Sequence, residues 1–155
     1  MPIRYRQDMS STTLLKYVSD IENILSMIDI NPNESRAHSI EGFRWLFQWG
    51  SARIEVTVAE RGAAGYLQVS SPLMTLPDTG LEAFFRALLN QNLEMTSAAL
   101  ALHENVVYVF SERPLDGMDT EEARFIITRV ASYADDLDNY LVNTYGGKLY
   151  EDDAN

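Results

Sequence analysis

The stretch FRWLFQWGSARIEVTV, residues 43–58, constrains the fold of this chain more than any other. Apolar side chains recur at every second position on both sides of Gly50-Ser51. A period of two predicts β-strands with one buried face, and a Gly-Ser pair between them suits a two-residue type II′ turn. Such a turn places Phe47 opposite Ile54, so that the large apolar side chains share one face. The other face carries polar side chains, namely Arg44, Gln48, Arg53 and Glu55.

The residues before this hairpin predict an amphipathic helix. Apolar residues recur in steps of three and four over residues 11–29, and the expected buried stripe is Leu14, Val18, Ile21, Leu25 and Ile28. Ser10 or Ser11 is expected to cap this helix, and Asn31-Pro32 to end it. Residues 31–41 are mostly polar, and we expect them to form a loop.

The residues after the hairpin predict further strands and two helices. A third strand follows the loop RGAAG, and Thr79 with Glu82 forms a capping box for a helix over residues 80–93. Two more strands, MTSAALAL and VVYVFSE, precede a long helix that Asp119 caps and Gly146-Gly147 ends. The buried stripe expected for the helix over residues 80–93 is Leu81, Phe84, Phe85, Leu88 and Leu89. For the last helix it is Ala123, Ile126, Ile127, Val130, Ala134, Leu137 and Leu141.

The element order is therefore α-β-β-β-α-β-β-α, which predicts a single α+β domain with an antiparallel sheet packed with helices. We expect the domain to span residues 1–147 and a polar, frayed tail to span residues 148–155. A chain of 155 residues, 46% of them hydrophobic, is long enough to bury a core without covalent staples. It contains no cysteine, which excludes disulfides and thiolate chemistry.

Charge limits the classes of partner. The formal net charge is −11, and most of the excess lies in residues 81–155. Such a surface repels phosphate backbones and anionic lipids, so we expect neither a nucleic acid nor a membrane as partner. A basic segment of another protein would be attracted to this negative charge. The alternative interpretation is that the charge serves solubility alone. No signal peptide or long apolar run is visible, so we expect a cytoplasmic protein.

The stretch LHENVVYVFSERPLDGMDTEE, residues 102–122, holds one histidine and six carboxylates and therefore raises the question of a metal or acid–base site. Its His103 falls in a predicted turn, and Asp119 suits a helix cap. The chain's other histidine, His38, lies in a distant loop, whereas a zinc site needs three or four converging ligands. We therefore expect no catalytic, metal or cofactor-binding residues and no cofactor.

Two other clusters have both a functional and a structural reading. Asp135, Asp136 and Asp138 could hold a cation or receive a basic partner, but a solvated helix face is favoured. The aromatic residues of residues 43–49 could stack on nucleic-acid bases, but core packing is favoured because no lysines lie between them. A pocket between sheet and helices, lined by Trp45, Phe47 and Phe85, would make the protein a small-ligand sensor, which is the alternative function.

The second hairpin, with Glu104-Asn105 as its turn, is apolar on both faces. One face carries Leu100 and Leu102, and the opposite face carries Ala99, Ala101, Val106, Tyr108 and Phe110. An antiparallel sheet with one solvated face shows one polar face, so a helix of the chain, a second subunit or a client must cover the second. We expect Val106, Tyr108 and Phe110 at a subunit or partner contact.

Residues 80–147 resemble the YbjN family of bacterial proteins in three motifs. These are L-x-x-N-L-E-M-T-x-A-A-L-A-L, V-V-Y-V-F-S-E-R-P-L-D-G-M-D-x-E-E and A-D-x-L-D-N-Y-L. The resemblance implies the fold of class I type III secretion chaperones, whose element order matches the one predicted here. It also implies a small, acidic, non-enzymatic homodimer. We therefore expect a protein-interaction module, a chaperone-like adaptor or regulator that binds another protein.

Overall fold

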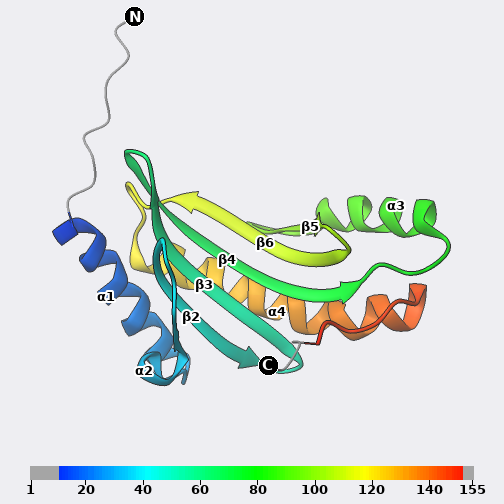
Figure 1. The fold of residues 1–155 in the computed structure, drawn as a ribbon, viewed down its shortest axis with the longest axis horizontal. Coiled ribbons are helices and arrows are strands. Elements are labelled where there is room, and N and C mark those ends of the chain that lie inside the picture. Colours follow the sequence, from blue (N-terminus) through cyan, green and yellow to red (C-terminus); the bar gives the residue numbers. More distant parts are fainter. Residues whose placement is uncertain (1–10, 152–155) are drawn as a thin grey trace, which may run out of the picture.

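The structure, a computed structural model, describes residues 11–151 and contains one antiparallel sheet packed with helices (Figure 1). The strand order in the sheet is β1-β2-β3-β4-β6-β5. The strands are β1 (Arg36–Ala37), β2 (Gly42–Trp49), β3 (Ala52–Arg61), β4 (Ala64–Thr75), β5 (Ala99–His103) and β6 (Val106–Pro114). The helices are α1 (Ser11–Met27), α2 (Pro32–Ser35), α3 (Leu81–Asn92) and α4 (Thr120–Tyr145). The predicted α+β class and antiparallel sheet are thus confirmed, with α2 and β1 added to the predicted order.

Both predicted hairpins form in the predicted register. In the β2–β3 hairpin, Phe47 pairs with Ile54 and Trp49 with Ala52 across the Gly50-Ser51 turn. Gly50 has φ +56°, which suits the first central position of a type II′ turn. In the β5–β6 hairpin, Leu100 pairs with Val109, as the alternating pattern predicted.

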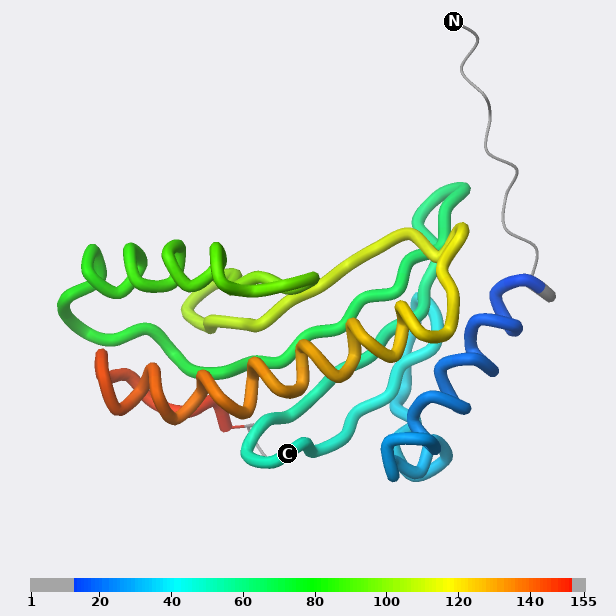
Figure 2. Tube along the Cα trace, turned by 180° about the vertical axis from the view of Figure 1, so that it is seen from behind, coloured from blue at the N-terminus to red at the C-terminus, as the bar shows by residue number. Residues whose placement is uncertain are grey.

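Helix α4 covers one face of the sheet. Figure 2 shows it from behind, lying across the strands, with α1 at one end. Every residue of the stripe predicted for this helix is buried, from Ala123 to Leu141. The predicted caps are also confirmed, because Asp119 Oδ1 accepts a hydrogen bond from the Glu122 N–H at 2.8 Å and Gly146 ends the helix with φ +87°. The core therefore lies between α4, α1 and the inner face of the sheet.

Residues 31–41 are more regular than the predicted loop. Asn31 does not simply end α1, because its side chain caps α2 by accepting from the Asn33 and Glu34 N–H groups. Strand β1 then pairs Arg36 with Trp45. The Arg36 guanidinium lies over the rings of Phe43 and Trp45, and bonds Glu22 of α1 at 2.9 Å. Tertiary contacts of one arginine thus order a segment whose composition is that of a loop. The predicted cap Ser10 lies outside the described residues.

Helix α3 departs from the prediction in two ways. Gly80, with φ +71°, precedes the helix without any side-chain cap, so the capping box predicted for Thr79 and Glu82 is wrong. Glu82 instead pairs with Arg86 one turn later at 3.1 Å. Of the stripe predicted to be buried, only Phe84 and Leu88 are buried. The reason is that α3 lies beside the sheet edge at β5, so only one narrow side of it meets the core.

The chain from Lys148 to Tyr150 pairs with β4, whereas the sequence predicted a frayed tail from residue 148. The Thr75 N–H donates to the Lys148 carbonyl and the Tyr150 N–H to the Leu73 carbonyl, each at 2.9 Å. Here β4 has left β3, and its pairing with β6 shifts register between Pro72 and Met74. The last described residues, which we call the C-terminal segment (148–151), therefore continue the sheet where β4 would otherwise offer unpaired backbone groups.

Candidate functional site

The sheet face opposite α4 carries no helix within residues 11–151 (Figure 1). On β5 and β6 this face is apolar, because Ala101 pairs with Tyr108 and Ala99 with Phe110. We call these residues with Val106 the open apolar patch: Ala99, Ala101, Val106, Tyr108 and Phe110. The two alanines are exposed and the three larger residues are half-buried. The residues predicted at a contact thus lie together on one surface, and no helix of the described chain covers them.

The same face is polar over β2, β3 and β4. Arg44 pairs with Glu55 at 2.8 Å, and Glu112 accepts from Arg61 at 3.1 Å and from Gln68 at 2.9 Å. Because these charges are paired with one another, this half of the face is polar with little net charge. The open apolar patch is therefore bounded on one side by ion pairs, as the apolar centre of an interface is bounded by a polar rim.

Tyr108 is the central residue of the open apolar patch. Burial raises the pKa of Tyr108 above its usual value of 10.0, and the nearby Tyr150, Glu55 and Glu104 raise it further. Its hydroxyl is therefore neutral at pH 7 and can donate a hydrogen bond while the ring offers apolar area. Tyrosine is enriched at protein interfaces for this combination of properties.

Helix α3 presents a second apolar surface. Leu81, Phe85, Leu89 and Leu93 follow one another at four-residue spacing, and we call them the α3 stripe. Leu89 is 68% exposed and Leu93 85% exposed. On another side of the helix, Asn92 Oδ1 accepts from the Leu100 N–H at 2.6 Å, which attaches α3 to the outer edge of β5. The helix is thus attached to the sheet while Leu81, Leu89 and Leu93 of its stripe are exposed, and Phe85 is partly buried against the core.

The structure does not bring the two histidines together. His38 follows β1 and His103 ends β5, and these strands are the opposite edges of the sheet. Among residues 11–151, no group of three or more histidine, aspartate or glutamate side chains is arranged to hold a metal ion. Within residues 102–122, several acidic side chains have structural partners, since Glu112 binds Arg61, Glu121 binds Arg124 and Glu122 binds Arg113.

Of the three aspartates predicted on a solvated face of α4, Asp136 is exposed as predicted, whereas Asp135 and Asp138 are not. Asp138 is only 4% exposed, and its Oδ2 lies 2.7 Å from Ser51 Oγ. Asp135 Oδ1 accepts from the Ser51 N–H at 2.7 Å and lies 2.9 Å from Ser51 Oγ. Both carboxylates thus hold the tip of the β2–β3 hairpin. The sequence contained a signal for this, because Asp138 lies four residues after Ala134 and so falls on the buried stripe.

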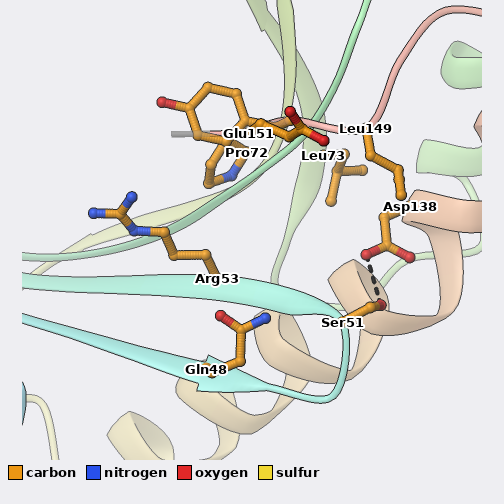
Figure 3. Close-up of a pocket in the computed structure, with 9 residues that line it drawn as sticks. Gln48, Ser51, Arg53, Pro72, Leu73, Asp138, Leu149 and Glu151 are labelled. Atoms are coloured by element: carbon orange, nitrogen blue, oxygen red, sulfur yellow. Dashed lines mark hydrogen bonds between the residues drawn. The ribbon is translucent and has the colours of Figure 1, made fainter. Parts of the chain in front are cut away.

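A pocket of about 250 Å³ lies beside this contact (Figure 3). Its walls come from the hairpin tip, from Pro72 and Leu73 of β4, from Asp138 and from the C-terminal segment. The pocket predicted between Trp45, Phe47 and Phe85 is not this one. Those three residues do not line a common pocket. Trp45 is fully buried, and Phe85 lies on α3 at the sheet edge opposite β2.

No helix of residues 11–151 is long and apolar enough to cross a lipid bilayer. No curated protein matches the chain. A solved structure titled "Structure of the HopA1-SchA Chaperone-Effector Complex" shares 11% sequence identity with it. The alignment covers 89% of this chain and 98% of that chain, with a TM-score of 0.57, which shows a shared fold. The family model of YbjN, described as "Putative bacterial sensory transduction regulator", matches residues 18–142. Because the match spans most of the chain, the protein belongs to the YbjN family.

Proposed function

We propose that this protein is a non-enzymatic, cytoplasmic interaction module, a chaperone-like adaptor or regulator that binds another protein on the open apolar patch. The observation that carries the proposal is the position of Val106, Tyr108 and Phe110. They lie in a row on a sheet face that no helix of residues 11–151 covers. Exposed apolar patches with polar rims are typical of protein-binding surfaces. The structural neighbour is, by its title, part of a chaperone–effector complex, which supports a role in binding another protein.

The partner that we propose is a protein segment with basic side chains. The chain carries a formal net charge of −11, so a basic segment is attracted over the distance of a Debye length. The charged side chains beside the open apolar patch form ion pairs with one another. At the rim of the patch they would offer hydrogen bonds to the partner. Apolar area at the centre would supply affinity, and the acidic surface would supply encounter rate and choice of partner.

We further propose that the protein is a homodimer and that the α3 stripe is its subunit contact. Leu89 on α3 and Leu93 directly after it are large apolar residues that face solvent, and the hydrogen bond between Asn92 and Leu100 attaches this helix to β5. A stripe of residues at four-residue spacing can pack against the same stripe of a second copy around a twofold axis. On this assignment, self-association and partner binding use different surfaces and can be perturbed separately.

The experiment is affinity capture from lysate of the source cell with three forms of the protein. The forms are wild type, Tyr108→Asp and Tyr140→Asp, and the last is the control because Tyr140 is exposed on α4, away from the open apolar patch. We expect wild type and Tyr140→Asp to retain a common partner and Tyr108→Asp to lose it. All three forms should have the same circular dichroism and the same molar mass by light scattering. Retention of the same partner by a folded Tyr108→Asp would contradict the proposal.

A further inference from the structure

The C-terminal segment lies at one end of the open apolar patch. Ala101 pairs with Tyr108 and Tyr108 with Pro72, so these side chains form a row across the open face of the sheet. Pro72 and Tyr150 line one pocket. Burial raises the pKa of Tyr108, and Tyr150 is near enough to raise it further. The row that begins on β5 therefore continues over β6 and β4 and ends at Tyr150.

The direction of the Tyr150 side chain follows from its neighbour Leu149. Leu149 pairs with Met74, whose side chain is fully buried, and in Figure 3 Leu149 extends toward Asp138 of α4. Successive side chains of an extended chain point to opposite faces of a sheet, so Tyr150 points away from α4. That face is the one that carries the open apolar patch. Tyr150 thus occupies space beside Tyr108 that a bound partner would otherwise fill.

The C-terminal segment is bonded to the sheet but buries none of its own residues. Two backbone hydrogen bonds join it to β4. None of residues 146–151 is buried, and Leu149 is 39% exposed. Water replaces backbone hydrogen bonds when a segment detaches, so their net contribution to holding it is small. Segments with few buried apolar contacts open at low free energy while the rest of the protein stays folded.

We propose that the C-terminal segment is a detachable strap, which occupies one end of the partner-binding surface in the free protein and is displaced when the partner binds. The inference rests on the proposed function for the existence of that partner. Displacement would uncover Tyr108 and Pro72, and it would free the Leu73 carbonyl and the Thr75 N–H of β4 for the partner's backbone. A protein that cannot replace the contacts of the strap would be excluded, so the strap would contribute to the choice of partner.

Gly147 offers a way to release the C-terminal segment in the full-length chain. It has φ +82°, and a Cβ atom built on it would clash with the Thr75 carbonyl oxygen and lie 2.9 Å from Met74 Cε. The backbone of β4 is fixed by its pairing with β6, so Gly147→Ala should push the segment away from β4. Gly146→Ala is the matched control, because Gly146 has φ +87° and no atom lies within 4 Å of the position of its new Cβ.

The first measurement needs no partner. Amide hydrogen exchange is followed by NMR at Thr75 and Leu76, whose N–H groups donate to Lys148 and Asn105, each at 2.9 Å. Only the bond of Thr75 is to the C-terminal segment. After correction for intrinsic rates, we expect Thr75 to exchange at least about tenfold faster than Leu76 in wild type. Gly147→Ala should remove the remaining protection of Thr75, and Gly146→Ala should not. Equal protection of both amides in wild type would overturn the inference.

The second measurement locks the C-terminal segment in place. The chain has no cysteine, so Thr75→Cys with Lys148→Cys can form a single disulfide across this antiparallel pair. We expect the oxidised protein to retain at least about tenfold less of the captured partner than the same protein after reduction. Equal retention by the two forms would overturn the inference and leave the proposed function standing. Retention of the partner by a folded Tyr108→Asp would instead contradict the proposed function.

Discussion

Replacing Gly50 by alanine tests how the hairpin tip is held against α4. Gly50 has φ +56°, and a Cβ atom built on it would lie 2.1 Å from Asp135 Oδ1. The left-handed backbone costs an alanine about 1–2 kcal/mol. The alanine also lowers the conformational entropy of the unfolded chain, which offsets about 0.4–1 kcal/mol of this cost. The close approach adds a larger cost, because Asp135 must move and lose its contacts with the Ser51 N–H and Oγ.

Hydrogen bonds to a charged group contribute about 1.5–3 kcal/mol each. Asp135 is only half-buried, so water replaces part of the bonding that it loses, and we expect Gly50→Ala to lower the free energy of unfolding by about 2–4 kcal/mol, a large share of the usual total. The control is Gly62→Ala, because Gly62 has φ +60° and no atom lies within 4 Å of the position that its new Cβ would take. Backbone strain alone should cost this variant about 1 kcal/mol or less.

The assay is urea unfolding followed by tryptophan fluorescence, with the free energies of both variants compared at equal m-value. A further arm places Gly50→Ala in an Asp135→Ala background, where the close approach no longer exists. There the cost of Gly50→Ala should fall to that of Gly62→Ala. If Gly50→Ala costs no more than Gly62→Ala in the original background, the aspartates do not hold the hairpin tip and the reasoning is refuted.

Three further predictions concern single side chains. Leu89→Glu should make the protein monomeric in light scattering with little change in the free energy of unfolding. Leu15→Glu, on the exposed side of α1, should leave the dimer intact. A dimeric Leu89→Glu would contradict the assignment of the α3 stripe to the subunit contact. Glu104 has φ +52° in the β5–β6 turn, so Glu104→Gly should raise the free energy of unfolding by up to about 1 kcal/mol, and a loss in thermal unfolding would contradict this. Because the pKa of the Tyr108 hydroxyl is raised in the folded protein, the unfolded chain loses the hydroxyl proton at lower pH than the folded protein does. The free energy of unfolding should therefore fall as pH rises above 10.0. Tyr108→Phe should lessen this alkaline loss, and an unchanged pH profile would refute the assignment.

The strands could be predicted well because their side-chain period leaves one consistent register. In the β2–β3 hairpin the turn and the alternation agree, so Phe47 and Ile54 pair as predicted. The same holds for α4, whose long stripe has a single buried side. Helix α3 could not be predicted as well, because its apolar residues surround more than half of the helix. Which of them become buried depends on the position of α3 at the sheet edge, and that is a tertiary property.

The candidate site was predicted in part. Alternation placed Val106, Tyr108 and Phe110 on one face, but periodicity cannot show that no helix of residues 11–151 covers that face. The pocket beside Asp138 could not be predicted, because its walls come from four separate parts of the sequence, around residues 50, 72, 138 and 150. Segments so far apart in sequence meet only through the sheet order and through the backbone bonds of the C-terminal segment. Charge clusters are usually solvated, so composition alone favoured the wrong reading for Asp138.

Hydroxyl-radical footprinting of the protein with and without its captured partner tests the central claim most directly, since it reports the solvent exposure of individual side chains. Tyr108 and Phe110 are half-buried and reactive, and Tyr140 on α4 is 55% exposed. We expect oxidation of Tyr108 and Phe110 to fall when the partner is bound and oxidation of Tyr140 to stay the same. Unchanged oxidation of Tyr108 and Phe110 in a saturated complex would show that the partner binds elsewhere.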